Sequence, residues 1–204
     1  MKASVELLWH CGTAPVLLAG AVECPGLQQT LAARLLAKLF SGQQYFRLGH
    51  NGLGRPLAFA SSGQPLQVGL SFSRYAGWLW TAASLTPELG IDVTGPEDFA
   101  DPYPERRVYA PGELDAGQQY SSSIFEARAL LWSLKEAAAK ALGTGFHRVE
   151  PLELEVENLR QADKHFLACQ ITSPQGSLNA LAGCANGMRV AVATRIHQAR
   201  SHHG

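Results

Sequence analysis

The chain has 204 residues, of which 46% are hydrophobic and 17% charged, and this composition excludes an intrinsically disordered protein. Its 17 basic and 17 acidic residues give a formal net charge of zero. Zero charge argues against nucleic-acid binding and against attachment to a membrane surface, because both need a basic excess. The expected partner is therefore a small molecule or a protein.

The first part of the chain predicts short strands around one helix. The apolar run over residues 14–22 contains Pro15 and Gly20 and is shorter than the roughly 20 residues that a membrane helix needs. We therefore interpret residues 1–22 as two short strands. Apolar residues at helical spacing predict a helix over residues 27–40. Further strands are predicted at residues 55–60, 67–72 and 77–84.

The second part repeats this pattern in a longer form. Residues 89–93 predict a strand, and a proline-rich acidic loop and a short helix at residues 105–109 follow. The serines at residues 121–123 offer an N-cap for a long helix that ends near residue 142, before Gly143. Apolar runs predict four final strands, at residues 152–156, 166–171, 178–182 and 188–194.

These patterns predict an α+β protein with two similar halves, residues 1–87 and residues 88–204. The zero net charge conceals a difference between them. Residues 1–87 carry six basic and two acidic side chains, a net charge of +4, whereas residues 88–115 carry eight acidic and two basic ones, a net charge of −6. The neutral total is therefore a sum of opposed patches.

The four cysteines, Cys11, Cys24, Cys169 and Cys184, show neither a C-x-x-C motif nor the spacing of a zinc site. A chain of this size favours reduced thiols and a cytoplasmic location, although the spacing also permits a disulfide.

The long helix has two unlike faces. Glu136 falls about 200° around the helix from Leu134, at 100° per residue, and therefore points away from the apolar face. Glu136 and Lys140 are spaced as an ordinary surface ion pair. However, the other residues on their face are Ala129, Trp132 and Ser133, which are not typical of a solvated surface. We therefore expect another segment to cover this face, with Trp132 packed beneath it.

Residues 132–146 resemble the W-S-x-K-E-A-x-x-K-x-x-G-x-G signature of the 4′-phosphopantetheinyl transferases, surfactin-type branch. Three other landmarks occur in the same order as in that family: Gly54-Arg55-Pro56 resembles its G-K/R-P motif, Ser71-Phe72-Ser73 its S-H-S motif, and Gly90-Ile91-Asp92 the start of its G-I-D-x-E motif. The resemblance covers residues 25–146 in detail.

This resemblance implies a fold of two joined α+β copies related by a pseudo-twofold, with the active site in the cleft between them. It implies transfer of the 4′-phosphopantetheine group of coenzyme A to a serine of an apo acyl or peptidyl carrier protein, with release of adenosine 3′,5′-bisphosphate. Mg²⁺ and coenzyme A are the implied cofactor and co-substrate. Residues 1–87 would hold the nucleotide, and residues 88–204 the metal. Because one chain supplies both halves, we expect a monomer.

The resemblance also suggests site residues. Asp92 and Glu136 are the expected metal ligands, and the candidate base for the acceptor serine is Glu136 or a metal-bound water. Lys140 is expected to stabilise charge on the leaving phosphate and, with Asp92 and Glu136, to form the catalytic set. Considered alone, Asp92 fits a turn cap equally well, and Lys135 fits a solvated side chain. The expected coenzyme contacts are Arg55, Pro56, Ser71, Phe72, Ser73, Arg74, Lys135 and Lys140.

Two departures from the family pattern bear on activity. Thr94 stands where the family has a second carboxylate, so we expect its hydroxyl to hold a water at the metal. Phe72 stands where the family has a histidine that contacts the 3′-phosphate of coenzyme A. Arg74 lies two residues later on the same side of the strand and is the candidate replacement. Gln28 and Gln29, near the first helix, offer no basic contact.

Two alternatives to an active transferase remain. One is a degenerate relative that binds a carrier protein or coenzyme A with little transfer, which the changes at Phe72 and Thr94 favour. The other is an unrelated α+β binding module.

Overall fold

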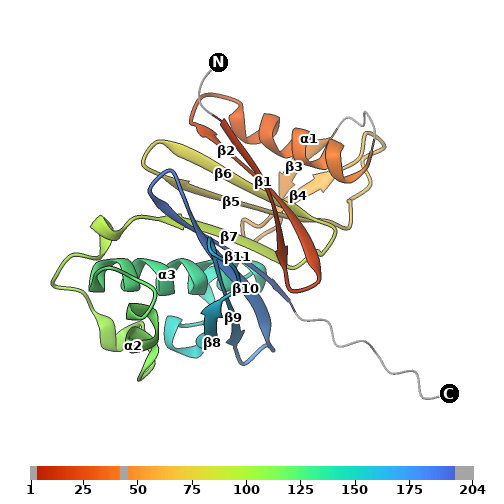
Figure 1. The fold of residues 1–204 in the computed structure, drawn as a ribbon. Helices are drawn as coiled ribbons and strands as arrows, with labels where there is room; N and C mark the ends of the chain where they lie inside the picture. Colours follow the sequence, from red (N-terminus) through yellow and green to blue (C-terminus); the bar gives the residue numbers. More distant parts are fainter. Residues whose placement is uncertain (1–3, 42–45, 196–204) are drawn as a thin grey trace.

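The computed structural model describes residues 4–41 and 46–195. Two antiparallel sheets pack face to face, and each carries a helix on its outer face (Figure 1). The mixed α+β class that the sequence predicts is therefore confirmed. The pseudo-twofold relation between the halves and the boundary at residue 87 stay predictions, and residues 196–204 of the second predicted half lie outside the described range.

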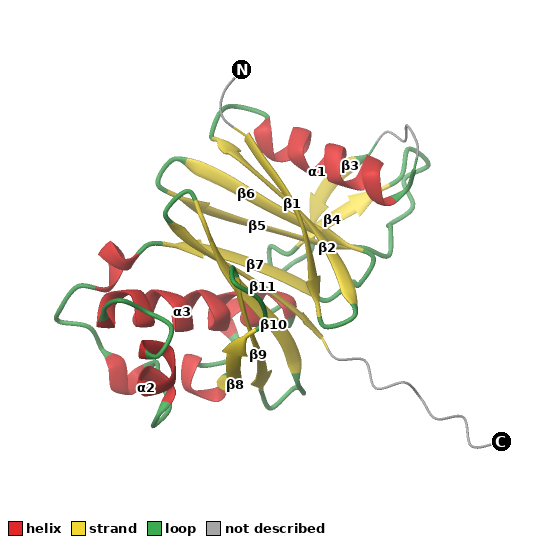
Figure 2. Cartoon of the chain, in the orientation of Figure 1, coloured by secondary structure: helices red, strands yellow, loops and turns green. Residues whose placement is uncertain are grey.

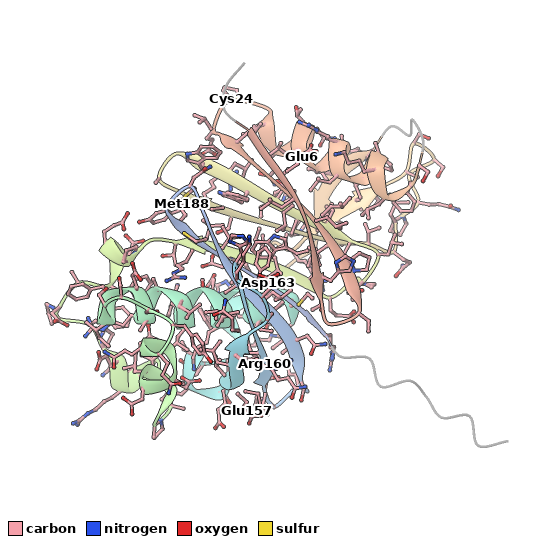
Figure 3. The ribbon with its side chains drawn as sticks, in the orientation of Figure 1. Glu6, Cys24, Glu157, Arg160, Asp163 and Met188 are labelled. Atoms are coloured by element: carbon pink, nitrogen blue, oxygen red, sulfur yellow. The ribbon has the colours of Figure 1, made fainter. Side chains whose placement is uncertain are left out.

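The first sheet has the strand order β1-β2-β6-β5, and helix α1 covers its outer face (Figure 2). The charged surface of α1 is tied to the sheet, since Glu6 of β1 forms ion pairs with Arg34 and Lys38 (Figure 3). A separate two-stranded sheet, β3-β4, lies beside this helix. The bounds are β1 Ser4–Cys11, β2 Ala14–Val22, α1 Leu27–Leu39, β3 Arg47–His50, β4 Pro56–Phe59, β5 Gly69–Tyr75 and β6 Trp78–Ser84.

The second sheet has the order β7-β11-β10-β9-β8, and helix α3 packs on its outer face. Ser123 caps α3, because its hydroxyl oxygen accepts a hydrogen bond from the backbone N–H of Glu126. The bounds are β7 Leu89–Thr94, α2 Glu113–Gln118, α3 Ile124–Ala141, β8 Glu155–Gln161, β9 Phe166–Thr172, β10 Leu178–Ala185 and β11 Met188–Arg195; the 3-10 turns are η1 Pro96–Phe99, η2 Glu105–Arg107, η3 Gly145–His147 and η4 Pro151–Glu153.

Strand β7 is buried on both faces, and its alternation directs the site residues. Ile91 and Val93 enter the core between the two sheets, whereas Gly90, Asp92 and Thr94 face the side of α3. A Cβ atom at position 90 would overlap the backbone carbonyl of Ala137, so glycine is what allows α3 to lie this close to the strand. The helix and the carboxylate of Asp92 are thereby brought together.

Most predicted elements agree with the structure to within a few residues. The strand predicted at residues 152–156 is wrong in its first part. Residues 152 and 153 belong to the turn η4, and β8 begins only at Glu155. The predicted helix at residues 105–109 is the shorter turn η2. Strand β3 and helix α2 were not predicted; both are short, with four and six residues. Among the described helices, none combines the length and apolar character needed to cross a membrane.

Candidate active site

A pocket of about 560 Å³ opens where the β3–β4 segment, β5 and the C-terminal end of α3 meet. Each of the two sheet-and-helix assemblies contributes residues to this pocket. Three of its lining side chains carry a positive charge: Arg55, Arg74 and Lys140. Its lining residues are Gln28, His50, Leu53, Gly54, Arg55, Pro56, Leu70, Ser71, Phe72, Arg74, Glu136, Lys140, Gly143, Thr144, Gly145, Phe146 and His147.

One ammonium group, that of Lys140, contacts two carboxylates: Glu136 lines the pocket together with Lys140, whereas Asp92 does not line it. Lys140 Nζ lies 2.8 Å from Asp92 Oδ1 and 3.6 Å from Glu136 Oε1, and it also donates to the backbone oxygen of Ile91 at 3.1 Å. The side chain of Asp92 is only 9% exposed, and that of Glu136 is 24% exposed. The structure therefore brings together the three residues that the sequence assigns to catalysis.

The electrostatics of Glu136 suit proton transfer. Burial raises the pKa of its carboxyl group above the ordinary value, and the charge of Asp92 raises it further, whereas Lys140 opposes both effects. A carboxylate with a raised pKa is a better proton acceptor near neutral pH than an ordinary one. The pKa of Glu136 is therefore held above that of a solvent-exposed carboxyl group.

The pair of carboxylates also fits Mg²⁺, which typically binds through one or two protein carboxylates together with phosphate oxygens and water. Among the described residues, no group of three or more His, Cys, Asp and Glu side chains gathers as a candidate metal centre. Thr94 is buried beyond Asp92 on the same face of β7, and its hydroxyl donates to Asp98 Oδ2 at 3.4 Å. The fit therefore rests on Asp92 and Glu136, and Thr94 is engaged by Asp98.

The serines of the S-F-S motif lie on the seam between the sheets. Ser71 Oγ accepts a hydrogen bond from the N–H of Ile91 at 3.0 Å, and Ser73 Oγ accepts one from Val93 at 3.1 Å. Ser73 also donates to Asp92 Oδ1 at 3.0 Å. Ser71 lines the pocket, whereas Ser73 does not, and both are buried.

Arg55 and Pro56 line the pocket from the β3–β4 segment. The side chain of Asn51 shapes the approach to Arg55, because its Oδ1 accepts from the N–H groups of Leu53 and Arg55 at 3.0 and 2.9 Å. The guanidinium of Arg55 donates to the backbone oxygen of Pro87. Burial lowers the pKa of Arg55, and the charge of Glu88 partly offsets this effect. Arg55 therefore connects the pocket to the segment that joins the two sheets.

Phe72 and Arg74 both line the pocket, as their spacing on one side of β5 predicts. Phe72 also packs against the core beneath α1. Arg74 has acidic and amide partners already, since its Nε lies 2.7 Å from Glu23 Oε1 and its Nη2 lies 2.9 Å from Gln28 Oε1. A phosphate at this position would have to compete with Glu23.

Lys135 is a correction to the sequence interpretation, which made it a solvated side chain or a coenzyme contact. It is fully buried and does not line the pocket. Its Nζ lies 2.8 Å from Glu113 Oε2 and donates to the backbone oxygens of Pro151 and Leu154 at 3.0 and 2.7 Å. Lys135 therefore ties α3 to α2 and to the turn η4, on a side of the helix away from Glu136.

The face of α3 around Trp132 is covered, as its unusual composition suggests. Ala129 and Ser133 are fully buried, and the Trp132 ring lies between Phe99 of η1 and Phe146 of η3, with centroid distances of 6.3 and 5.2 Å. Packing is thus the role that the contacts give Trp132.

Two histidines of the pocket wall, His50 and His147, are not among the site residues that the sequence predicts. Each lies near a recognised motif, since His50 is four residues before Gly54, and His147 directly follows Phe146. Their proximity to motifs on both sides of the pocket was the available signal. Both add further polar groups to a wall that already contains Arg55, Arg74 and Lys140.

A family model matches part of the chain. The family model for the 4′-phosphopantetheinyl transferase superfamily matches residues 88–193, which is more than half of the chain. No curated protein matches the sequence. The matched segment includes Asp92, Glu136 and Lys140.

Proposed function

Since the chain belongs to the 4′-phosphopantetheinyl transferase superfamily, we propose that it moves the 4′-phosphopantetheine group of coenzyme A to a serine of an apo acyl or peptidyl carrier protein. The observation that carries this proposal is the contact of Lys140 with both Asp92 and Glu136, where Glu136 and Lys140 line one pocket and Asp92 lies directly behind Lys140. A single chain supplies all of these groups, which supports a monomeric enzyme. Coenzyme A and the carrier protein are the proposed partners.

The pocket wall suits a charged nucleotide. Arg55, Arg74 and Lys140 place positive charge around it, and phosphate groups gain from charge-assisted hydrogen bonds with such side chains. We assign Arg55 and Pro56 to the nucleotide and Arg74 to its 3′-phosphate. The hydrophobic ring of Phe72 contributes only packing to this part of the pocket.

Asp92 and Glu136 are the residues that would hold Mg²⁺, which supplies charge neutralisation at the pyrophosphate when bound. Asp92 is fixed by two donors, Ser73 and Lys140. Glu136 is more exposed than Asp92, so it is the carboxylate that can reach both the cation and the incoming serine.

The transfer itself requires one proton acceptor and one positive charge. The hydroxyl oxygen of the carrier serine bonds to the phosphorus that bears the pantetheine arm, and the bond from that phosphorus to the bridging pyrophosphate oxygen breaks. Glu136 accepts the serine proton. Lys140 stabilises the negative charge that develops on the departing adenosine 3′,5′-bisphosphate.

A second candidate function is binding of coenzyme A or a carrier protein with little transfer. Two observations favour it: Thr94 provides no carboxylate, and Arg74 is already paired with Glu23. The retained set of Asp92, Glu136 and Lys140 favours transfer.

The deciding experiment incubates the protein with coenzyme A, Mg²⁺ and several apo carrier proteins, followed by mass spectrometry of the carriers. The proposal expects a mass gain equal to one phosphopantetheine arm. Asp92→Asn serves as the inactive control. Coenzyme binding by calorimetry without any mass gain would support the binding-only function instead.

A further inference from the structure

We propose that Ser73 is a positioning residue that fixes the carboxylate of Asp92 for a divalent cation, whereas Ser71 only holds the two sheets together. This inference deepens the proposed function and rests on it, because it concerns the same metal site. It assigns different roles to two serines that look equivalent in the sequence.

The two serines lie at the seam between the sheets, where the edges of β5 and β7 meet. Strand β7 pairs with β11 along one edge, and its other edge faces β5. The N–H groups on a free strand edge need partners when they are buried. Ser71 and Ser73 supply them: their Oγ atoms accept hydrogen bonds from Ile91 and Val93, at 3.0 and 3.1 Å.

The spacing explains why both serines point the same way. Residues two apart on a strand lie on one side of it, so the hydroxyls of Ser71 and Ser73 both reach the edge of β7. Ser71 also lines the pocket, whereas Ser73 does not. The two hydroxyls therefore form matched contacts with the edge of β7. In that respect each serine is a control for the other.

The hydroxyl of Ser73 donates a hydrogen bond as well as accepting one. A backbone N–H can only donate, so Ser73 Oγ is the acceptor in its contact with Val93, and its own proton is free to be donated elsewhere. Asp92 Oδ1 lies 3.0 Å away and accepts it. One hydroxyl therefore links the backbone of β7 to the side chain of Asp92.

Both donors to the Asp92 carboxylate use the same oxygen, Oδ1. Lys140 donates to the same atom, Asp92 Oδ1, at 2.8 Å. Two donors on Oδ1 fix the rotation of the carboxylate, and we assign the other oxygen, Oδ2, to the cation. Partners of metal ligands orient those ligands, and their removal typically weakens metal binding by about 10- to 100-fold.

The experiment compares Ser73→Ala with Ser71→Ala. Each variant removes one acceptor from the seam, but only Ser73→Ala also removes the donor to Asp92. Mn²⁺ serves as the probe, and its binding to the protein without coenzyme is measured by electron paramagnetic resonance. We expect the dissociation constant for Mn²⁺ to rise about tenfold in Ser73→Ala and to stay unchanged in Ser71→Ala. Ser73→Thr, which keeps the hydroxyl, should restore the parent value.

Urea unfolding of the same variants separates positioning from stability. Both alanine variants should lose stability, because each leaves one N–H of β7 without its acceptor. Equal weakening of Mn²⁺ binding in the two variants would overturn the inference, as would parent-like binding in Ser73→Ala. If Ser73→Ala does not fold, Ser73→Cys, which retains the side-chain size but has a weaker donor, should weaken Mn²⁺ binding in the same direction.

Transfer by the parent protein is assayed separately. If Ser73→Ala weakens Mn²⁺ binding but the parent protein modifies no carrier, the proposed function is contradicted and the role of Ser73 stands. If the parent protein modifies carriers but Ser73→Ala leaves the Mn²⁺ affinity unchanged, the proposed function stands and the role of Ser73 is contradicted.

Discussion

The ammonium of Lys140 lies 2.8 Å from the carboxylate of Asp92, although the two residues are 48 positions apart in the chain. Lys140 belongs to the last turn of α3 and Asp92 to the middle of β7, so the close packing of this helix on this strand creates the contact. Glu136, one helical turn before Lys140, joins the same group. The chemistry of the site is therefore a consequence of one helix–strand interface.

Neutral isosteres test this group directly. We expect Asp92→Asn and Glu136→Gln each to reduce carrier modification by about a hundredfold or more, since we assign the Asp92 carboxylate to the metal and the Glu136 carboxylate to the serine proton. Transfer rates come from mass spectrometry of the carrier protein. Glu157→Gln is the matched control, because this exposed carboxylate, labelled on β8 in Figure 3, does not line the pocket. A parent-like rate for Glu136→Gln would contradict the assignment of the helix face.

Thr94 provides no carboxylate, so a carboxylate introduced at this position should improve metal binding. Thr94→Glu adds a negative oxygen donor two residues after Asp92, on the same face of β7. However, Asp98 Oδ2 lies only 3.4 Å from the Thr94 hydroxyl, so like-charge repulsion should limit the gain. We expect a modest increase in Mn²⁺ affinity in Thr94→Glu and a larger one when Asp98→Asn is added. The same titration on Asp98→Asn alone provides the control, and a loss of affinity in both backgrounds would contradict the prediction.

Sequence patterning predicts the parts of this molecule that depend on local spacing. The N-cap among the serines at residues 121–123 follows from capping preference, and the two faces of α3 follow from helical periodicity. The partners of buried polar groups do not follow from spacing, because they depend on which segments come together in the fold. Lys135 illustrates this limit, since its partner Glu113 lies on a helix too short to be recognised from its six residues.

The same limit explains the two serines. Their motif indicates a role near the coenzyme, yet their hydroxyls are turned toward the N–H groups of β7. No local pattern shows that β5 and β7, which belong to different sheets, lie edge to edge. The fold supplies that information, and it changes what the motif means in this chain.

Arg74 can be tested through its competitor. We expect Arg74→Ala to weaken coenzyme A binding by roughly tenfold or more, the loss typical of a hydrogen bond to a charged group. Glu23→Gln should strengthen binding slightly, because it removes the carboxylate that holds Arg74 at 2.7 Å; exposed ion pairs of this kind contribute only about 0.2–1 kcal/mol. Calorimetric titration measures both affinities, with Arg160→Ala on β8 as a distant control (Figure 3). Unchanged affinity in Arg74→Ala would exclude its role at the 3′-phosphate.

The buried pair of Lys135 and Glu113 should affect stability. Removing one partner leaves an uncompensated charge in the interior, so Lys135→Met and Glu113→Gln are each expected to lower the free energy of unfolding by about 3–5 kcal/mol. The double variant should lose less than the two single losses together, since neither charge is then left alone. Urea unfolding followed by circular dichroism measures these values. A loss below about 1 kcal/mol in Lys135→Met would contradict the pairing.

The cysteines differ in burial, and this difference predicts their reactivity. Burial raises the pKa of the Cys11 thiol to about 11, and Cys169 is also buried, whereas Cys184 is exposed. Because the thiolate is the reactive form, iodoacetamide at pH 8 should label Cys184 in the folded protein and Cys11 only after unfolding. Peptide mass spectrometry identifies the labelled sites. Rapid labelling of Cys11 in the folded protein would contradict its placement.

The same raised pKa of Cys11 predicts how stability depends on pH. The folded-state pKa lies above the unfolded value of 9.0, so the unfolded chain loses this proton first as the pH rises. Stability from the neutral thiol is therefore intact below pH 9 and is lost as the pH rises through about 11. The difference of two units corresponds to about 3 kcal/mol. Cys11→Ala should flatten this alkaline decline in urea unfolding, and Cys184→Ala should leave it unchanged; identical slopes for Cys11→Ala and the parent would contradict the prediction.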